Sequence, residues 1–371
     1  MKKARIFISY HPGSLVDFDH IRVTDNQTSL PLLIMCKHPY LTLEIISVYG
    51  DKFKSCVVLP DINYEKNIFF GFIKLTRYLR EFKEKMNPFL DKVDSFEIIS
   101  DCSAYLPVNA VISTLRKSPK FSRLVSIRFD YTFKRQTDSL KTFLVNFYVW
   151  SFGLLNIYVH KRFSYLYINE PNSAVITFKK QFSYSDKMKV NENNKKEIIL
   201  IERPTINFNN KSRDMIVIFS DLNLLKAFKE NLNKEEYENK LKVFFAALSK
   251  FYKGHRIIVK PHPQNKGRLM PGLGQIEHQS YTGSYTSQMF LELNALEVKA
   301  CYSATSTALL YAAERGIPSY TFYKYLNFKN ENLKLFFESV EVKNNYLLFN
   351  LRNINEIGVI DQGVCNTKDK N

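Results

Sequence analysis

The sequence predicts an α/β protein with two Rossmann-like lobes and a cleft between them. The chain has 371 residues, more than a single hydrophobic core ordinarily serves. Its hydrophobic content of 45% is enough to fill two cores. Short apolar runs alternate with helical patterns, which is typical of a parallel sheet with crossover helices, and this series occurs twice.

The first series fills the first half of the chain. Its expected strands are Arg5–Tyr10, Leu32–Met35, Cys56–Leu59, Phe96–Ile99 and Leu124–Phe129. Its expected helices are Ile68–Met86 and Val108–Arg116. The nearly apolar stretch Phe143–Val159 is shorter than the roughly 20 residues that span a bilayer. It is interpreted as a buried helix, with a helix lying on a membrane surface as the alternative.

The second series begins after a polar stretch rich in Asn and Lys, within which Glu197–Ile201 is expected to form a strand. Its expected strands are Met215–Phe219, Arg256–Lys260, Val298–Tyr302 and Ser319–Phe322. Its expected helices are Lys234–Lys253, Tyr285–Leu293 and Ala308–Arg315, the last closed by Gly316 and Pro318. The sequence thus predicts an N-terminal lobe over residues 1–175, an interlobe connection over 176–211, a C-terminal lobe over 212–345 and a tail over 346–371.

Charge and cysteine usage narrow the class of protein. Lys and Arg outnumber Asp and Glu by 53 to 36, a net charge of +17 that favours an anionic partner. No compact Arg-rich block or nucleic-acid motif is present, so nucleic acid is not expected, and a solvated basic surface is the alternative. The 5 cysteines form no CxxC pair, which predicts neither a zinc site nor a disulfide framework and fits a reducing cytoplasm.

A histidine between two prolines follows a buried strand of the second series. In Lys260-Pro261-His262-Pro263 the prolines restrict the backbone, so His262 is presented rigidly at the sheet edge. There it can donate a hydrogen bond or a proton to a phosphate oxygen. Pro263 and Lys260 are expected beside the same phosphate. The alternative is a loop histidine with a structural role.

A run of hydroxyl side chains lies between the next strand and the helix that follows it. The expected phosphate ligands are Ser303, Thr305, Ser306 and Thr307. Hydroxyls and free N–H groups at a helix N-terminus bind anions, although simple N-capping also explains one hydroxyl. Ser220 and Asp221 follow the strand Met215–Phe219 and are expected either to line the same site or to form a plain turn.

These motifs resemble those of a known family. Ile258–Pro263 and, about forty residues on, Ser303–Ala312 resemble the His-Pro and Ser/Thr motifs of bacterial sialyltransferases, most of all the capsule polysialyltransferases. Ser212–Ser220 and Asn146–Trp150 are similar to the opening strand of their nucleotide lobe and to an aromatic run of their first lobe. The likeness spans about residues 124–322. It implies the two-lobed GT-B glycosyltransferase architecture without a metal or other cofactor.

The resemblance also implies roles for single residues. His262, Thr305, Ser306 and Thr307 would engage the phosphate of CMP-sialic acid. The family's general base belongs to an acidic pair followed by glycine, and Ser126–Thr132 stands in that place. Asp130 is the nearby carboxylate there and the candidate base. Its rivals at neighbouring strand ends are Asp101, Asp17 and Asp19.

The resemblance implies an inverting transferase of sialic acid or a related nonulosonic acid. It would act from a CMP-linked donor onto a capsule, O-antigen or lipooligosaccharide acceptor, which a lipid would carry. The basic surface predicts peripheral association with the inner, anionic face of the cytoplasmic membrane. The alternatives are a transferase that uses a Kdo or CDP-glycerol donor, and a non-catalytic basic protein that binds nucleotides or nucleic acid.

Asp17-Phe18-Asp19, with His20 beside it, resembles the metal-binding DxD of other glycosyltransferases, but a turn is the favoured interpretation.

Overall fold

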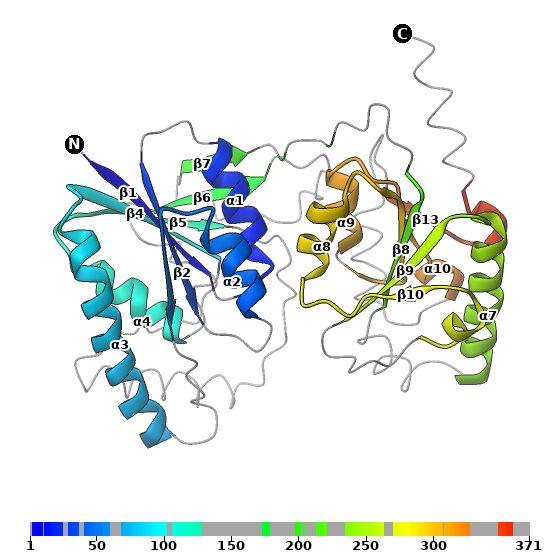
Figure 1. Cartoon of the computed structure of the whole chain (residues 1–371), viewed down its shortest axis with the longest axis horizontal. Helices are drawn as coiled ribbons and strands as arrows, with labels where there is room; N and C mark the ends of the chain where they lie inside the picture. Colours follow the sequence, from blue (N-terminus) through cyan, green and yellow to red (C-terminus); the bar gives the residue numbers. More distant parts are fainter. Residues whose placement is uncertain are drawn as a thin grey trace, which may run out of the picture. The chain divides into compact units, whose positions relative to one another are not determined.

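A computed structural model shows two α/β units, each built on one parallel sheet (Figure 1). The structure describes residues 2–9, 11–24, 29–36, 41–59, 68–101, 106–127, 173–178, 197–201, 203, 206, 213–220, 234–262, 270–306, 308–326 and 348–358. Unit 1 comprises Met1–Lys179 and Asn191–Ile201, and unit 2 comprises Lys180–Val190 and Glu202–Asn371. The predicted fold class, two Rossmann-like lobes, is confirmed.

Unit 1 holds a parallel sheet with the strand order β3-β2-β1-β4-β5-β6-β7. The strands are β1 (Lys3–Ser9), β2 (Leu30–Cys36), β3 (Ser55–Leu59), β4 (Ser95–Ser100), β5 (Phe121–Ile127), β6 (Ser173–Phe178) and β7 (Glu197–Ile201). The helices are α1 (Ser14–Thr24), α2 (Leu43–Gly50), α3 (Ile68–Leu90) and α4 (Leu106–Leu115). Helices α1 and α2 lie on one face of the sheet, and α3 and α4 lie on the other (Figure 1).

Both faces of β1 are covered, which explains its continuous apolar run. Ile6 and Ile8 belong to a core cluster with α3 and α4, to which Phe82 contributes. Phe7 points to the opposite face, where its ring centroid lies 5.3 Å from those of Phe18 in α1 and Phe53. The alternation of strand side chains therefore builds a core on each side of the sheet.

Unit 2 holds a second parallel sheet with the order β10-β9-β8-β11-β12-β13. Its strands are β8 (Met215–Ser220), β9 (Arg256–Pro261), β10 (Gln279–Ser280), β11 (Val298–Ser303), β12 (Ser319–Thr321) and β13 (Leu348–Asn350). Its helices are α7 (Lys234–Phe251), α8 (Ser287–Asn294), α9 (Ala308–Glu314) and α10 (Tyr323–Leu326). Helix α7 lies on one face of this sheet, and α8 and α9 lie on the other (Figure 1).

Aromatic side chains fill the core between this sheet and α7. Phe244 of α7 packs against Phe322 with ring centroids 4.4 Å apart. Tyr302 and Tyr320 stack at 4.6 Å on neighbouring strands, and the hydroxyl groups of Tyr252 and Tyr302 form a buried hydrogen bond of 2.8 Å. A buried tyrosine needs such a partner for its polar end, so the contact fixes the rings in place.

Helix α9 ends where the sequence predicts. Gly316 adopts a φ of 84°, a left-handed conformation that favours glycine. Its N–H donates to the carbonyl oxygen of Ala313, and the N–H of Ile317 donates to that of Ala312. This pair of bonds is a Schellman motif, which satisfies carbonyl groups that the helix end would leave unpaired.

The structure differs from the sequence-based expectations at several elements. Helices α1 and α2 were not expected, and α1 contains Asp17 and Asp19, for which a turn was favoured. Strand β7 was expected within the interlobe connection, and it pairs with β6 of the first sheet. Strand β13 lies in the expected tail but pairs with β12. Short edge strands depend on a neighbouring strand for their hydrogen bonds, so their membership in a sheet is a tertiary property.

The apolar stretch Phe143–Val159 lies outside the described residues. Within the part of the chain that the structure describes, no helix is long and apolar enough to cross a membrane.

Candidate functional site

The candidate site of unit 2 lies where its strand order reverses. The chain passes from β8 to β9 on one side and later returns to β11 on the other side of β8. In open α/β sheets, ligands bind outside the carboxyl ends of the strands at such a switch point. Ser220 ends β8, His262 follows β9 and Ser303 ends β11. Three segments far apart in the sequence thus meet at one sheet edge.

Hydrogen bonds join these strand ends directly. The backbone N–H of His262 donates to the carbonyl oxygen of Ser220 over 3.0 Å. The hydroxyl of Ser303 donates to the carbonyl oxygen of Phe219, also over 3.0 Å. The ends of β9 and β11 are therefore both tied to the end of β8, which holds the predicted site residues on a rigid edge.

The Ser/Thr turn uses two of its hydroxyls internally. Ser303 is completely buried, and its oxygen also accepts a hydrogen bond of 3.2 Å from the N–H of Ser306. The Ser306 hydroxyl oxygen accepts one of 3.3 Å from the N–H of Ala308 and so caps α9. The hydroxyl of Thr321 donates to the carbonyl oxygen of Ala304 over 2.6 Å. Ser303 therefore positions the turn, while the buried Thr305 lies between these anchored residues.

Lys260 carries a buried positive charge at this edge. Its side chain is 3% exposed, and its Nζ lies 4.8 Å from the centroid of the Tyr281 ring. The N–H of Tyr281 donates to the carbonyl oxygen of Val259, which places this ring beside Lys260. Among the described residues no carboxylate forms an ion pair with Lys260. Burial lowers the pKa of Lys260 to about 8, so most of the molecules still carry this charge at neutral pH.

A buried ammonium without a counter-ion is costly, because the charge has left water without gaining an opposite charge. An anionic ligand at this edge would supply that charge. Lys260 is thus the clearest sign of an anion site among the described residues. The remaining predicted site residues, Pro263, Thr307, Asp221 and Asp130, lie outside the described part of the chain.

An ion-pair network that the sequence did not reveal holds α8 against α9. Both carboxylate oxygens of Glu292 accept hydrogen bonds from Arg315, over 2.6 and 3.1 Å, and one accepts a further bond of 2.5 Å from the Tyr311 hydroxyl. Arg203 pairs with Glu314 and lies 5.1 Å from the centroid of the Tyr311 ring. These contacts fix the helix that follows the Ser/Thr turn. No local sequence motif predicts these contacts, because they join residues that are far apart in the sequence.

Unit 1 has its own switch point, between β1 and β4. The backbone N–H of His11 donates to a carboxylate oxygen of Asp101 over 3.3 Å. The Nδ1 of His11 accepts a hydrogen bond of 3.1 Å from the N–H of Gly13, which places the ring proton of neutral His11 on Nε2. Asp101, one of the rivals for the general base, thus lies at the edge where the strand order predicts ligand binding.

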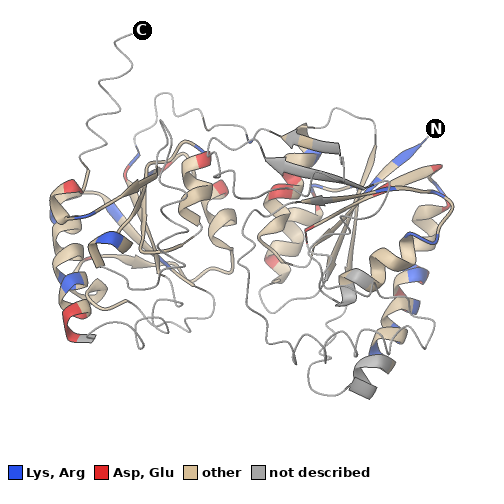
Figure 2. Cartoon of the chain, turned by 180° about the vertical axis from the view of Figure 1, so that it is seen from behind, with Lys and Arg blue, Asp and Glu red and all other residues tan. Residues whose placement is uncertain are grey.

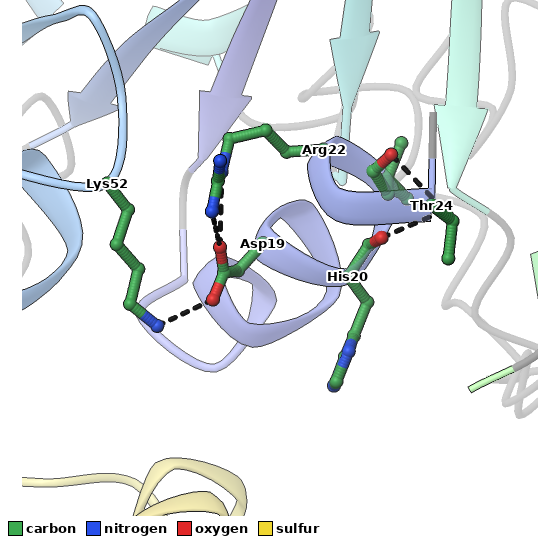
Figure 3. Close-up of polar contacts among 6 residues, drawn as sticks. Asp19, His20, Arg22, Thr24 and Lys52 are labelled. Carbon is green, nitrogen blue, oxygen red and sulfur yellow. Dashed lines mark hydrogen bonds and ion pairs between the residues drawn. The ribbon is translucent and has the colours of Figure 1, made fainter. Parts of the chain in front are cut away.

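The other two rivals lie in α1. Asp17 is 2% exposed. Asp19 accepts hydrogen bonds from Arg22 at 2.7 Å and from Lys52 at 2.5 Å, one on each carboxylate oxygen (Figure 3). In the same close-up the Thr24 hydroxyl donates to the carbonyl oxygen of His20 (Figure 3). The described residues contain no group of three or more potential metal ligands. The DxD triplet lies within helix α1, and Asp19 belongs to an ion-pair network.

Comparisons with known proteins identify the fold of this chain. No family model and no curated protein sequence matches the chain. The sialyltransferase from Photobacterium damsela is similar in structure, with a TM-score of 0.50 and 10% identity over 94% of this chain and 81% of that chain. The GT-B domain of the sialyltransferase from Photobacterium damselae has a TM-score of 0.49 and 10% identity, covering 94% of this chain and 100% of that one. UDP-N-acetylglucosamine 2-epimerase from Rickettsia bellii has a TM-score of 0.44 and 15% identity, covering 99% and 95%.

At such low identities the similarity shows the fold alone. The chain therefore has a GT-B-like architecture of two parallel α/β units.

Proposed function

We propose that this protein is an inverting glycosyltransferase that moves sialic acid or a related nonulosonic acid from a CMP-linked donor to a bacterial surface glycan. The observation that carries the proposal is the buried ammonium of Lys260, which has no carboxylate partner among the described residues, next to His262 at the β8–β9–β11 edge. The GT-B-like fold supports the class of enzyme. The resemblance of the His-Pro and Ser/Thr motifs to bacterial sialyltransferases supports the donor.

The proposed reaction is a single displacement at the anomeric carbon of the donor sugar. The acceptor hydroxyl oxygen forms the new bond as the bond to the phosphate oxygen breaks, and CMP leaves with the electron pair. Lys260, His262 and the Ser/Thr turn stabilise the charge that develops on the leaving phosphate. A carboxylate takes the acceptor proton. The resemblance to bacterial sialyltransferases makes Asp130 the candidate for this general base. Asp101, at the switch point of unit 1, is the alternative.

The charge of the protein fits this substrate class. A CMP-linked acid sugar carries both a phosphate and a carboxylate, and the chain has a net charge of +17. CMP-linked Kdo and CDP-glycerol would present the same cytidine phosphate to this edge. The sugar must therefore be tested separately from the nucleotide.

The test is thermal unfolding with CMP, CDP, UDP or GDP in the presence of EDTA. We expect CMP and CDP to raise the melting temperature most, since a ligand at 100 times its Kd adds about 2.7 kcal/mol to the unfolding free energy. Preferential binding of UDP that requires Mn²⁺ would contradict the proposal. Release of CMP from CMP-sialic acid, compared with release from CMP-Kdo, then identifies the sugar.

A further inference from the structure

A pocket between α3 and α4 lies away from the switch point of unit 1. Its volume is about 640 Å³, and the lining comes from the carboxyl-terminal halves of the two helices and the turn before β5. The pocket therefore belongs to the amino-terminal edge of the sheet, whereas His11 and Asp101 follow the carboxyl ends of β1 and β4. Its size is in the range of small-molecule and lipid sites, roughly 300–1,000 Å³.

The lining of this pocket is apolar inside and basic outside. Three of the four buried lining residues, Phe82, Met86 and Leu115, also belong to the core of unit 1, and the fourth is Ser113. The partly buried Leu79 and Leu90 join them. The exposed basic lining residues are Arg80, Lys83 and Lys117. An apolar floor below a cationic rim matches a molecule with an anionic head and a hydrocarbon tail.

Within the part of the chain that the structure describes, the basic rim has no counter-ions. No hydrogen bond or ion pair within the described residues engages the side chains of Arg80, Lys83 or Lys117. Lys120 differs, because its Nζ donates to the carbonyl oxygen of Leu90 over 2.7 Å and so neutralises the end of α3. Asp91 is the one carboxylate of the lining.

The rest of α3 extends the positive surface. Lysine and arginine recur along the described part of the helix in Figure 2. Beyond the pocket these basic residues are Lys74, Arg77 and Lys85. The helix carries five basic residues against two acidic ones, Glu81 and Glu84, and Glu81 is bound to Arg77 over 3.0 Å. A row of cations beside an apolar pocket favours a negatively charged membrane, where each basic residue near the surface contributes about 1 kcal/mol.

We propose that the α3–α4 pocket binds an anionic phospholipid and thereby docks unit 1 on a negatively charged membrane. The lipid phosphate contacts Arg80, Lys83 and Lys117, and one acyl chain enters the apolar floor. A nucleic acid would bind the basic rim but has no hydrocarbon chain that could enter the apolar floor, so the pocket fits a lipid better. The inference does not depend on the donor site, because no residue is shared between the two.

The test uses the full chain and co-sedimentation with vesicles of phosphatidylcholine alone or with phosphatidylglycerol. The variant Arg80→Gln/Lys83→Gln/Lys117→Gln removes the rim. Its matched control, Arg352→Gln/Lys250→Gln/Lys253→Gln, removes one Arg and two Lys from exposed positions of unit 2. We expect the rim variant to bind anionic vesicles on the order of 100-fold more weakly, since three basic residues contribute about a factor of five each. The control variant should bind like the parent.

A second measurement separates the pocket from a diffuse charge effect. Dihexanoyl phosphatidylglycerol below its micelle concentration should bind the parent protein and not the rim variant, while dihexanoyl phosphatidylcholine and inorganic phosphate should bind neither measurably. Equal vesicle binding by both variants would overturn the proposal. So would failure of the parent to bind the short lipid, or tighter binding of single-stranded DNA than of anionic vesicles through the same three residues.

Discussion

The backbone N–H of His262 donates a hydrogen bond of 3.0 Å to the carbonyl oxygen of Ser220. This bond continues the pairing of β8 with β9 one residue beyond the strand, past Pro261, which has no N–H of its own. The backbone at His262 is thus fixed by the sheet. A side chain that must meet a developing charge benefits from such fixation, because a preorganised group needs no rearrangement during the reaction.

Replacement of His262 by alanine should separate catalysis from folding. We expect His262→Ala to reduce turnover of the CMP-linked donor by roughly 10²-fold, because it removes a proton or hydrogen-bond donor to the leaving phosphate. The backbone bond to Ser220 remains, so the melting temperature should change little. The control is His255→Ala, just before β9 at the opposite edge, where the ring contacts Lys299. Near-normal turnover of His262→Ala would contradict a catalytic role and indicate that this histidine is structural.

Replacement of Lys260 by methionine should weaken binding of anionic ligands. Methionine keeps the unbranched shape and removes the charge, so we expect the affinity for CMP to fall by about tenfold or more. In the parent, the affinity should fall as the pH rises through about 8, where the Lys260 ammonium loses its proton. Titration calorimetry from pH 6.5 to 9.5 measures both effects. A variant affinity equal to that of the parent would show that the phosphate binds elsewhere.

The same substitution should raise stability. Burial lowers the pKa of Lys260 from 10.5 to about 8, so the folded state carries an unfavourable charge at neutral pH. We expect Lys260→Met to increase the free energy of unfolding by up to roughly 3 kcal/mol at pH 7. Between pH 8 and 10.5 the unfolded parent binds more protons than the folded one, so the parent gains stability and the difference shrinks. Urea unfolding at several pH values, with the exposed Lys250→Met as control, tests the sign.

Two carboxylates compete for the role of general base. Asp130→Asn should abolish transfer and preserve CMP binding if Asp130 takes the acceptor proton. Asp101→Asn provides the comparison, because Asp101 lies at the β1–β4 switch point beside His11. Transfer that persists in Asp130→Asn and disappears in Asp101→Asn would assign the base to Asp101. The kcat of each variant, measured with saturating donor, distinguishes the two.

The Glu292–Arg315 pair should support the Ser/Thr turn through α9. Glu292→Ala leaves the largely buried Arg315 without its carboxylate, and we expect a loss of about 3 kcal/mol in the free energy of unfolding. Glu236→Ala, which breaks the exposed pair with Lys240 on α7, should cost at most about 0.5 kcal/mol. Urea denaturation of both variants measures the contrast. Equal small losses would mean that the buried pair is dispensable.

Much of the local structure could be predicted because it depends on short-range chemistry. The apolar run Met215–Phe219 and the apolar centre of Arg256–Lys260 became β8 and β9, since a strand covered on both faces is largely apolar. The end of α9 followed from Gly316, whose positive φ an L side chain resists. Helix α1 was missed because its buried face includes Ser14 and Asp17, so it lacks a clear apolar stripe.

By itself, the sequence determined the two-unit α/β class and the strand-end positions of His262 and Ser303. Only the tertiary structure decided that these strand ends are neighbours of β8, that Ser303 serves the turn and that Lys260 is buried beside Tyr281. The physical reason is that the spacing of apolar residues along a helix or strand shows only which of its faces is buried. Strand order, counter-ions and the pocket between α3 and α4 depend on contacts between residues that are distant in the chain.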